Sequence, residues 1–135
     1  MRDSARAVII RDRKVLTMFR RKIKDGAVNE YYVIPGGGIE EGETEEETVV
    51  RELQEEMSVE VEIVDFLGKE ETINGNAYYY LCKIKDDAEP RLGGEELERM
   101  TEDNFYQPRF IDIEKLDNVD LFGKEFVFKA LKLKI

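Results

Sequence analysis

The chain has 135 residues, with 31 acidic against 21 basic side chains, a net charge of −10 and no histidine. This acidic excess argues against nucleic-acid polymers and anionic membranes as partners, because both attract basic surfaces. The lack of histidine excludes Ser-His-Asp and Cys-His catalysis and imidazole metal sites, so any chemistry must use carboxylates, lysines, tyrosines or water activated by a metal ion.

Length and a hydrophobic content of 41% predict a single domain with a buried core over residues 1–135. Cys82 is the only cysteine, and its apolar neighbours indicate a core thiol. No apolar stretch of signal-peptide length follows the amino terminus. We therefore expect a soluble cytoplasmic protein, either a monomer or a homodimer.

The first third of the chain predicts short strands. Residues 4–11 and 15–19 are rich in β-forming side chains and form a plausible hairpin through the polar turn between them. A polar segment at residues 20–30 is broken by Asp-Gly. A further short strand is expected at residues 31–34, where it is stopped by a proline and three glycines.

The rest of the chain predicts a helix between strands and another helix at the end. Residues 59–73 and 76–85 are two β-rich runs joined by Asn-Gly, which is a strong hairpin signal. Residues 86–104 are charged and predict a long loop that carries at most a short helix. A last strand is expected at 109–113, followed by an amphipathic helix around 126–131. The fold class is therefore α/β.

The central helix has a well-defined start. Thr44 can cap it, with Glu47 three residues later completing a capping box. Glutamates in the first turn also suit the positive end of the helix dipole. An apolar stripe is expected to pack on the sheet, formed by Val49, Val50, Leu53 and Met57.

Three carboxylates crowd together beside that stripe, at Glu52, Glu55 and Glu56. Like charges three and four residues apart destabilise a helix unless a cation lies among them. Mg²⁺, or Mn²⁺ in its place, prefers such hard oxygen ligands, and Arg51 could orient a neighbouring carboxylate. Glutamate-rich surface helices are common, however, so the helix alone favours an ordinary solvated acidic face.

The spacing of the whole segment favours a metal site instead. The sequence from Gly37 to Val59 resembles the Nudix box of Nudix hydrolases (MutT-like), whose pattern is Gly-x5-Glu-x7-Arg-Glu-U-x-Glu-Glu-x-Gly-U, with U an aliphatic residue. Every position of the pattern is met over 23 residues except one, where Ser58 replaces the last glycine. A left-handed conformation is commonly needed there, so Ser58 is expected to affect the helix end and stability and not the metal chemistry.

The resemblance implies the Nudix fold, an α/β/α sandwich around a mixed sheet with a catalytic loop-helix-loop. It also implies hydrolysis of a nucleoside diphosphate linked to another moiety, a small-molecule nucleotide, with Mg²⁺ as cofactor. Carried over by position, the metal-binding residues are Glu52, Glu55, Glu56 and Gly37.

The resemblance gives roles to other residues as well. Arg51 holds the catalytic helix and its acids in register, and Glu43 supports the site. The general base would be Glu52, Glu55 or a later glutamate. Family members often use one more acid from outside the box, for which the sequence offers Glu95, Glu96, Glu98 and Glu102.

Substrate contacts are less well defined by the sequence. Residues 1–25 hold nine basic and three acidic side chains, so Arg20 and Arg21 could bind phosphates and Tyr32 could contact the base or sugar. Solvated surface charge and core packing are the simpler explanations, and alternation along a strand lets only some of these basic side chains face the site.

The preferred substrate is a nucleoside triphosphate, intact or damaged, cleaved to the monophosphate. ADP-ribose or another nucleotide sugar is the alternative, disfavoured because the proline that often follows the box in ADP-ribose hydrolases is absent at residues 74–76. Two other classes remain open, a nucleotide sensor without catalysis and an acidic calcium-buffering or scaffold protein. The sensor is disfavoured because all box acids are present, and the calcium protein because the EF-hand loop spacing is missing.

Overall fold

The computed structural model describes residues 2–133, so residue 1 and residues 134–135 of the predicted domain lie outside it. A mixed eight-stranded sheet has the order β5-β6-β1-β2-β3-β8, with β4 paired to β1 and β7 paired to β2. In chain order the elements are β1 (Ser4–Arg11), β2 (Lys14–Lys24), β3 (Ala27–Val33), β4 (Gly36–Gly38), α1 (Glu45–Met57), β5 (Val61–Thr72), β6 (Gly75–Ile84), the 3₁₀ helix η1 (Lys85–Asp87), α2 (Gly94–Arg99), β7 (Asn104–Asp112), the 3₁₀ helix η2 (Ile113–Asn118), β8 (Leu121–Phe122) and α3 (Lys124–Leu133).

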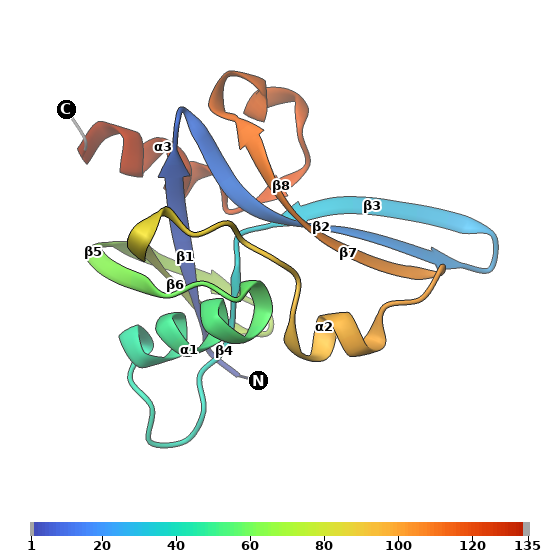
Figure 1. The fold of residues 1–135 in the computed structure, drawn as a ribbon, viewed down its shortest axis with the longest axis horizontal. Coiled ribbons are helices and arrows are strands. Elements are labelled where there is room, and N and C mark those ends of the chain that lie inside the picture. The colour runs from blue at the N-terminus through green and yellow to red at the C-terminus, as the bar shows by residue number, and fades with distance from the viewer. Residues whose placement is uncertain (1, 134–135) are drawn as a thin grey trace.

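The sheet is covered by a helix on each face (Figure 1). Successive residues of a strand point to opposite faces, so the central strands supply two cores. Ala5 and Ala7 of β1 pack with Leu53 beneath α1. Val8 of the same strand packs with Val127 beneath α3. The predicted α/β/α sandwich around a mixed sheet is therefore present.

The polar segment at residues 20–30 is part of the sheet, which the sequence did not indicate. β2 continues to Lys24, turns at Asp25-Gly26 and returns as β3. β7 also begins earlier than expected, at Asn104, where it pairs with Lys22. These strands form an arm that extends away from α1 and α3 (Figure 1). With little core to cover, the arm tolerates polar residues, so its strands lack an apolar pattern.

Helix α1 begins as predicted. The Thr44 side chain accepts a hydrogen bond from the Glu47 amide, and the Glu47 side chain accepts one from the Thr44 amide, which completes the capping box. The predicted apolar stripe is wrong at one position, because Val50 is 40% exposed. Glu56, by contrast, is only 5% exposed. The buried face of α1 therefore includes a carboxylate, which directs attention to that side chain.

The other elements predicted after α1 are present as the expected type, strand or helix. β5 and β6 form the predicted hairpin, but its turn is Ile73-Asn74, because Gly75 already pairs with Thr72 as the first residue of β6. Cys82 of β6 is buried in the core. The charged segment after β6 carries the short helix α2, and the expected carboxy-terminal helix is α3. Within residues 2–133, no helix is both long and apolar enough to cross a membrane.

Candidate active site

The glycine-rich strand β4 lies beside α1 and approaches its carboxylates closely. A side chain at Gly37 would collide with the Glu52 carboxyl group, so any other residue there would force that carboxyl group to move. Pairing with β1, where Ala5 is opposite Gly37, fixes the register of this strand. The glycine required by the box pattern therefore has a steric reason in this chain.

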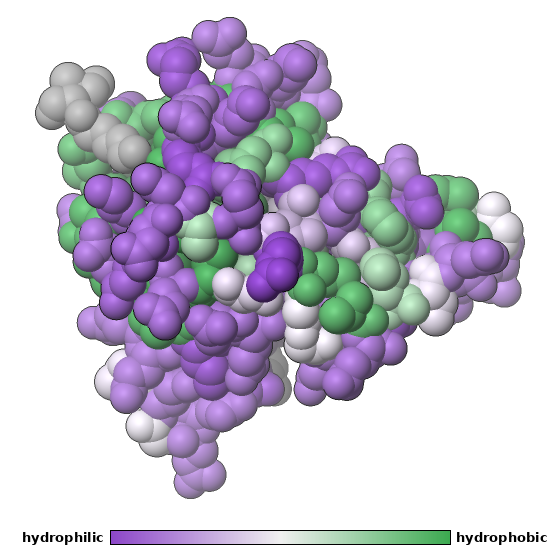
Figure 2. Space-filling model, viewed as in Figure 1, coloured by the Kyte–Doolittle hydropathy of each residue, from purple (hydrophilic) through white to green (hydrophobic). Residues whose placement is uncertain are grey.

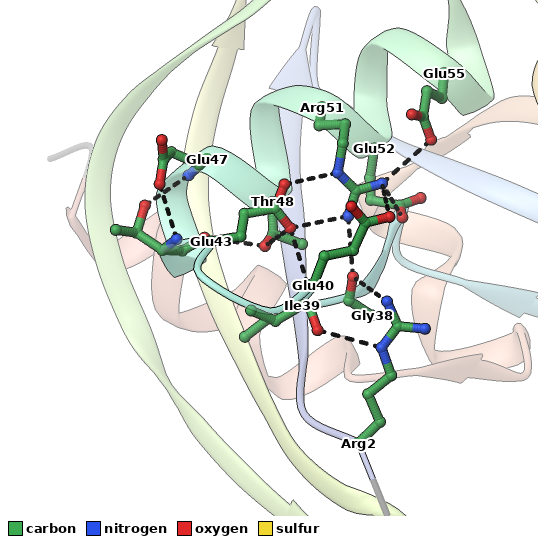
Figure 3. Close-up of polar contacts among 11 residues, drawn as sticks. Arg2, Gly38, Ile39, Glu40, Glu43, Glu47, Thr48, Arg51, Glu52 and Glu55 are labelled. Carbon is green, nitrogen blue, oxygen red and sulfur yellow. Dashed lines mark hydrogen bonds and ion pairs between the residues drawn. The ribbon is translucent and has the colours of Figure 1, made fainter.

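Arg51 is the centre of the polar network on α1 (Figure 3). Its Nε and Nη2 donate to the two carboxylate oxygens of Glu43, at 2.7 and 2.9 Å. Its Nη1 donates to Glu52 at 2.9 Å and to Glu55 at 3.2 Å, and Nη2 also reaches the carbonyl oxygen of Gly38 at 3.0 Å. One planar guanidinium thus ties the approach loop, the glycine strand and two helix acids together.

Glu43 is held as a carboxylate by this network. Hydrogen bonds from Arg51 and from the Thr48 hydroxyl, the latter at 2.6 Å, lower the pKa of Glu43 from its ordinary 4.5 to about 2. Because both partners favour the charged form, Glu43 remains an anchor for Arg51 over the whole neutral range. The supporting role that the resemblance implies for Glu43 stays a prediction.

Glu56 has the opposite environment. Burial is the largest cause that raises its pKa from 4.5 to about 8, and the charges of Glu96 and Glu52 raise it further. The Gly36 amide donates to its Oε2 at 3.3 Å. Burial likewise raises the pKa of Glu52. Buried carboxyl groups with so few donors are suited to a cation as their missing partner.

A distant loop closes the carboxyl end of α1. The Arg91 amide donates to the Met57 carbonyl at 2.9 Å, and the Gly93 amide donates to the Glu56 carbonyl at 2.8 Å. Helix ends leave such carbonyls without partners inside the helix, so this loop satisfies them. The same contacts place α2 directly beside the acids of α1.

The acids of the two helices line one small pocket of about 160 Å³, formed by Arg2, Gly38, Glu40, Arg51, Glu52, Glu55, Glu56, Glu95 and Glu96. Of the four candidate acids outside the box, Glu95 and Glu96 line this pocket, whereas Glu98 and Glu102 do not. The surface over α1 and its approach loop is strongly hydrophilic (Figure 2). The pocket therefore brings α1 and α2 carboxylates together at the surface.

The donor chemistry of this pocket fits a hard divalent cation, because its acidic ligands are all carboxylate oxygens. Within residues 2–133, no three acidic, histidine or cysteine side chains are arranged as a finished metal cluster. Arg51 forms ion pairs with two of the pocket's carboxylates, Glu52 and Glu55.

A larger cavity of about 610 Å³ adjoins the acidic pocket, since Arg2 and Gly38 line both. Arg6 of β1, Glu70 of β5 and Tyr79 of β6 line this cavity. Phe122 of β8 lines it too, with a ring that is largely exposed. Three of these side chains, Arg6, Glu70 and Phe122, were not singled out in the sequence. They lie on three different strands, and the sequence does not show that these strands contribute to one cavity.

Arg20 lies on the face of the sheet that carries α1. Arg20 lies two residues after Met18 on β2, so both side chains point to the face beneath that helix, where Met18 is part of the core. The Arg20 guanidinium lies over the Tyr106 ring, 5.5 Å from its centroid. Its charge lowers the pKa of Glu56, so the two groups are electrostatically coupled. The Arg20 Nε is buried and has no hydrogen-bond partner among residues 2–133.

Arg21 and Tyr32 lie on the opposite face of the arm. The Arg21 guanidinium stacks over Phe105 at 5.0 Å, and the Tyr32 ring packs against Phe19 at 5.1 Å. Phe19 and Tyr32 are directly paired across β2 and β3, which places both on one face. The structure therefore brings one of the three predicted substrate contacts, Arg20, to the side of the acidic pocket.

Comparison with known proteins identifies the chain. Residues 1–127 match the family model described as NUDIX domain. The chain belongs to the Nudix family. This membership supports a Nudix-type pyrophosphohydrolase, as the box predicted; members act on small-molecule nucleotides and generally use a divalent metal ion. No curated protein matches the sequence.

Solved structures resemble this Nudix domain over most of its length. A MutT protein from Methanosarcina mazei Go1 is 19% identical with a TM-score of 0.66, covering 99% of this chain and 96% of its own. An ADP-ribose pyrophosphatase from Streptococcus suis 89-1591 is 18% identical with a TM-score of 0.67, covering 98% and 91%. A UDP-X diphosphatase is 17% identical with a TM-score of 0.68, covering 98% and 62%. At these identities the likeness shows the shared fold.

Ser58, the one departure from the box, has the left-handed conformation expected there, with φ 58° and ψ 33°. Replacement by glycine is expected to stabilise the protein by about 1 kcal/mol, because glycine adopts this conformation without strain. Thermal unfolding of Ser58→Gly should show the higher Tm, while kcat stays within about twofold of wild type. A large gain in kcat would instead mean that Ser58 limits the chemistry.

Proposed function

We propose that this Nudix domain hydrolyses a nucleoside triphosphate, intact or damaged, to the nucleoside monophosphate with Mg²⁺ as cofactor. The observation that carries the proposal is that two cavities adjoin. One is the acidic pocket on α1 and α2, and the other is lined by two arginines and an exposed phenylalanine. The first suits a metal-bound diphosphate and the second suits a nucleoside.

Mg²⁺, or Mn²⁺ as a substitute, would be held by Glu52, Glu55 and Glu56, with Glu96 or Glu95 from α2 as the additional acid. When bound, the ion neutralises phosphate charge and makes water more acidic. Glu56 is the ligand with the strongest need for it, because its carboxylate is buried with so few hydrogen-bond donors. The backbone of Gly37, which leaves room for Glu52, lies close to this position.

Three protein side chains have separate roles in the proposed reaction. Glu52 takes the proton of the attacking water, since its carboxylate lines the acidic pocket and is oriented there by Arg51. Arg51 orients Glu52 and Glu55 through its fork of donors. Arg20, with a buried and unpaired Nε, contacts the phosphate chain.

The larger cavity takes the nucleoside. Arg2 lines both the acidic pocket and the larger cavity, Arg6 lines the larger cavity, and the exposed ring of Phe122 offers a surface on which a base can stack. MutT and ADP-ribose pyrophosphatase are both names of structural neighbours. Asn74-Gly75-Asn76, where ADP-ribose hydrolases often have proline, favours the triphosphate. The domain spans residues 1–135, and we place it in the cytoplasm as a monomer or a homodimer.

A panel of nucleotides tests the proposal. Ribo- and deoxynucleoside triphosphates, oxidised purine triphosphates, ADP-ribose and a UDP-sugar are incubated with the protein and Mg²⁺, and products are separated by ion-exchange chromatography. We expect a nucleoside monophosphate and pyrophosphate from a triphosphate, with no product after addition of EDTA and full recovery with excess Mg²⁺. Cleavage of ADP-ribose or the UDP-sugar alone would establish the alternative substrate. Binding without any product would indicate a sensor.

A further inference from the structure

Three neighbouring strands contribute charged or polar side chains to the larger cavity. Arg6 of β1 is paired directly with Tyr79 of β6, and Glu70 lies on β5, the next strand. The charge of Arg6 lowers the pKa of Glu70, so the two side chains interact electrostatically. The cavity therefore has a cation on β1 and a carboxyl group on β5.

Glu70 is joined there by a second carboxyl group. Glu125, in the first turn of α3, disfavours the charged form of Glu70, whereas Arg6 and the Tyr79 hydroxyl favour it. Burial and Glu125 raise the pKa of Glu70. Within residues 2–133, no lysine or arginine forms an ion pair with Glu70, and the adjacent Lys69 pairs with Glu71 instead. A carboxyl group that lines a cavity without a cation partner is stabilised when a ligand supplies hydrogen-bond donors.

The position of this wall is fixed by packing. The Tyr79 ring stacks on Phe126 of α3 with centroids 4.0 Å apart and an interplanar angle of 9°. Gly123, with φ +86°, leaves the space that the Tyr79 hydroxyl occupies, because a Cβ there would lie 2.6 Å from that oxygen. Packing therefore fixes the position of the Tyr79 hydroxyl in the wall that Glu70 also lines.

We propose that Glu70 is a specificity-determining residue whose carboxylate accepts a hydrogen bond from the exocyclic amino group of the bound base. This inference rests on the proposed function, which places the nucleoside in the larger cavity. A deaminated base carries a carbonyl oxygen at that position, so two acceptors would face each other and neither would regain its lost hydrogen bond to water. The cavity therefore discriminates an amino-bearing base from its deaminated counterpart.

Equilibrium binding tests this without depending on hydrolysis. Isothermal titration calorimetry with Mg²⁺ compares three pairs of nucleoside monophosphates, CMP with UMP, AMP with IMP, and GMP with XMP. We expect the amino-bearing member of at least one pair to bind about tenfold more tightly, the effect of one well-placed hydrogen bond. In Glu70→Gln the ratio should fall below about threefold, because the glutamine amide can donate to a carbonyl oxygen.

Glu71→Gln is the matched control, since the Glu71 side chain is 80% exposed and does not line the cavity. It should retain the wild-type ratio, and unchanged Tm values should show that both variants are folded. The inference is overturned if no pair is discriminated, if nothing binds, or if Glu70→Gln keeps the full ratio. Discrimination without triphosphate hydrolysis would remove only the proposed function, whereas hydrolysis without discrimination would remove only the role of Glu70.

Discussion

Replacement of Glu56 by glutamine is expected to lower kcat by about 10²-fold or more while stabilising the metal-free protein at alkaline pH. The loss of activity follows because glutamine keeps the shape and the hydrogen bond from the Gly36 amide but not the charge that would hold a cation. The gain in stability follows because the buried carboxylate no longer has to ionise without a partner.

The raised pKa of Glu56 determines how the stability of the folded protein changes with pH. The pKa of Glu56 is raised to about 8 in the folded protein, against an ordinary 4.5. Its favourable contribution to folding is therefore fully present below pH 4.5, decreases as pH rises and is lost above pH 8, with a slope of at most about 1.4 kcal/mol per pH unit. Thermal unfolding in EDTA between pH 5 and pH 9 should show this decline in wild type and a flatter curve in Glu56→Gln.

Glu60→Gln serves as the control, because Glu60 is exposed and lies outside the acidic pocket. It should leave both kcat and the pH profile of stability unchanged. If Glu56→Gln lost stability along with activity, Glu56 would be a structural acid and not a ligand. Mg²⁺ should also raise the Tm of wild type more than that of Glu56→Gln, since ligand binding to the native state stabilises it.

Arg51→Ala is expected to lower both stability and activity. The substitution leaves Glu43, Glu52 and Glu55 without their shared cation, two of them largely buried, and loss of one partner of such a network costs about 2–4 kcal/mol. Misplaced carboxylates should reduce kcat by about 10- to 100-fold, the usual effect of removing a residue that orients metal ligands. Arg51→Lys should recover part of the stability but little of kcat, because an ammonium group cannot form the fork.

Acid titration distinguishes this network from general destabilisation. The pKa of Glu43 is lowered to about 2, so its contribution to stability is present above pH 4.5 and is lost as pH falls toward 2. The stability difference between wild type and Arg51→Ala should therefore shrink across that window in chemical denaturation. Arg13→Ala, which removes an ion pair between two exposed side chains, should cost less than about 0.5 kcal/mol at any pH.

The local features of this fold were predictable from its sequence because neighbouring residues determine them. The capping box at Thr44, the hairpin of β5 and β6 and the left-handed Ser58 each depend on a few adjacent side chains. The box likewise identified the acids of α1, because they occur at fixed spacing on one helix. What these features have in common is that no distant contact is needed to define them.

The features that escaped prediction depend on distant contacts. Val50 is exposed and Glu56 buried because β4 and the loop before α2 cover one side of α1, which helical periodicity does not reveal. The polar strands of the arm are held by pairing with β7, far along the chain. The choice of Glu95 and Glu96 among the later glutamates depends on where Gly93 joins α1.

The hydrogen bonds from residues 91 and 93 to the carboxyl end of α1 determine whether the box could be transferred to another protein. The last carbonyls of this helix receive their hydrogen bonds from amides more than 30 positions later in the chain. A fragment ending at β6 would contain every residue of the box yet lack the partners of that helix end and the acids of α2. The box is therefore not a portable module, and a graft onto another scaffold would need the later segment as well as the motif.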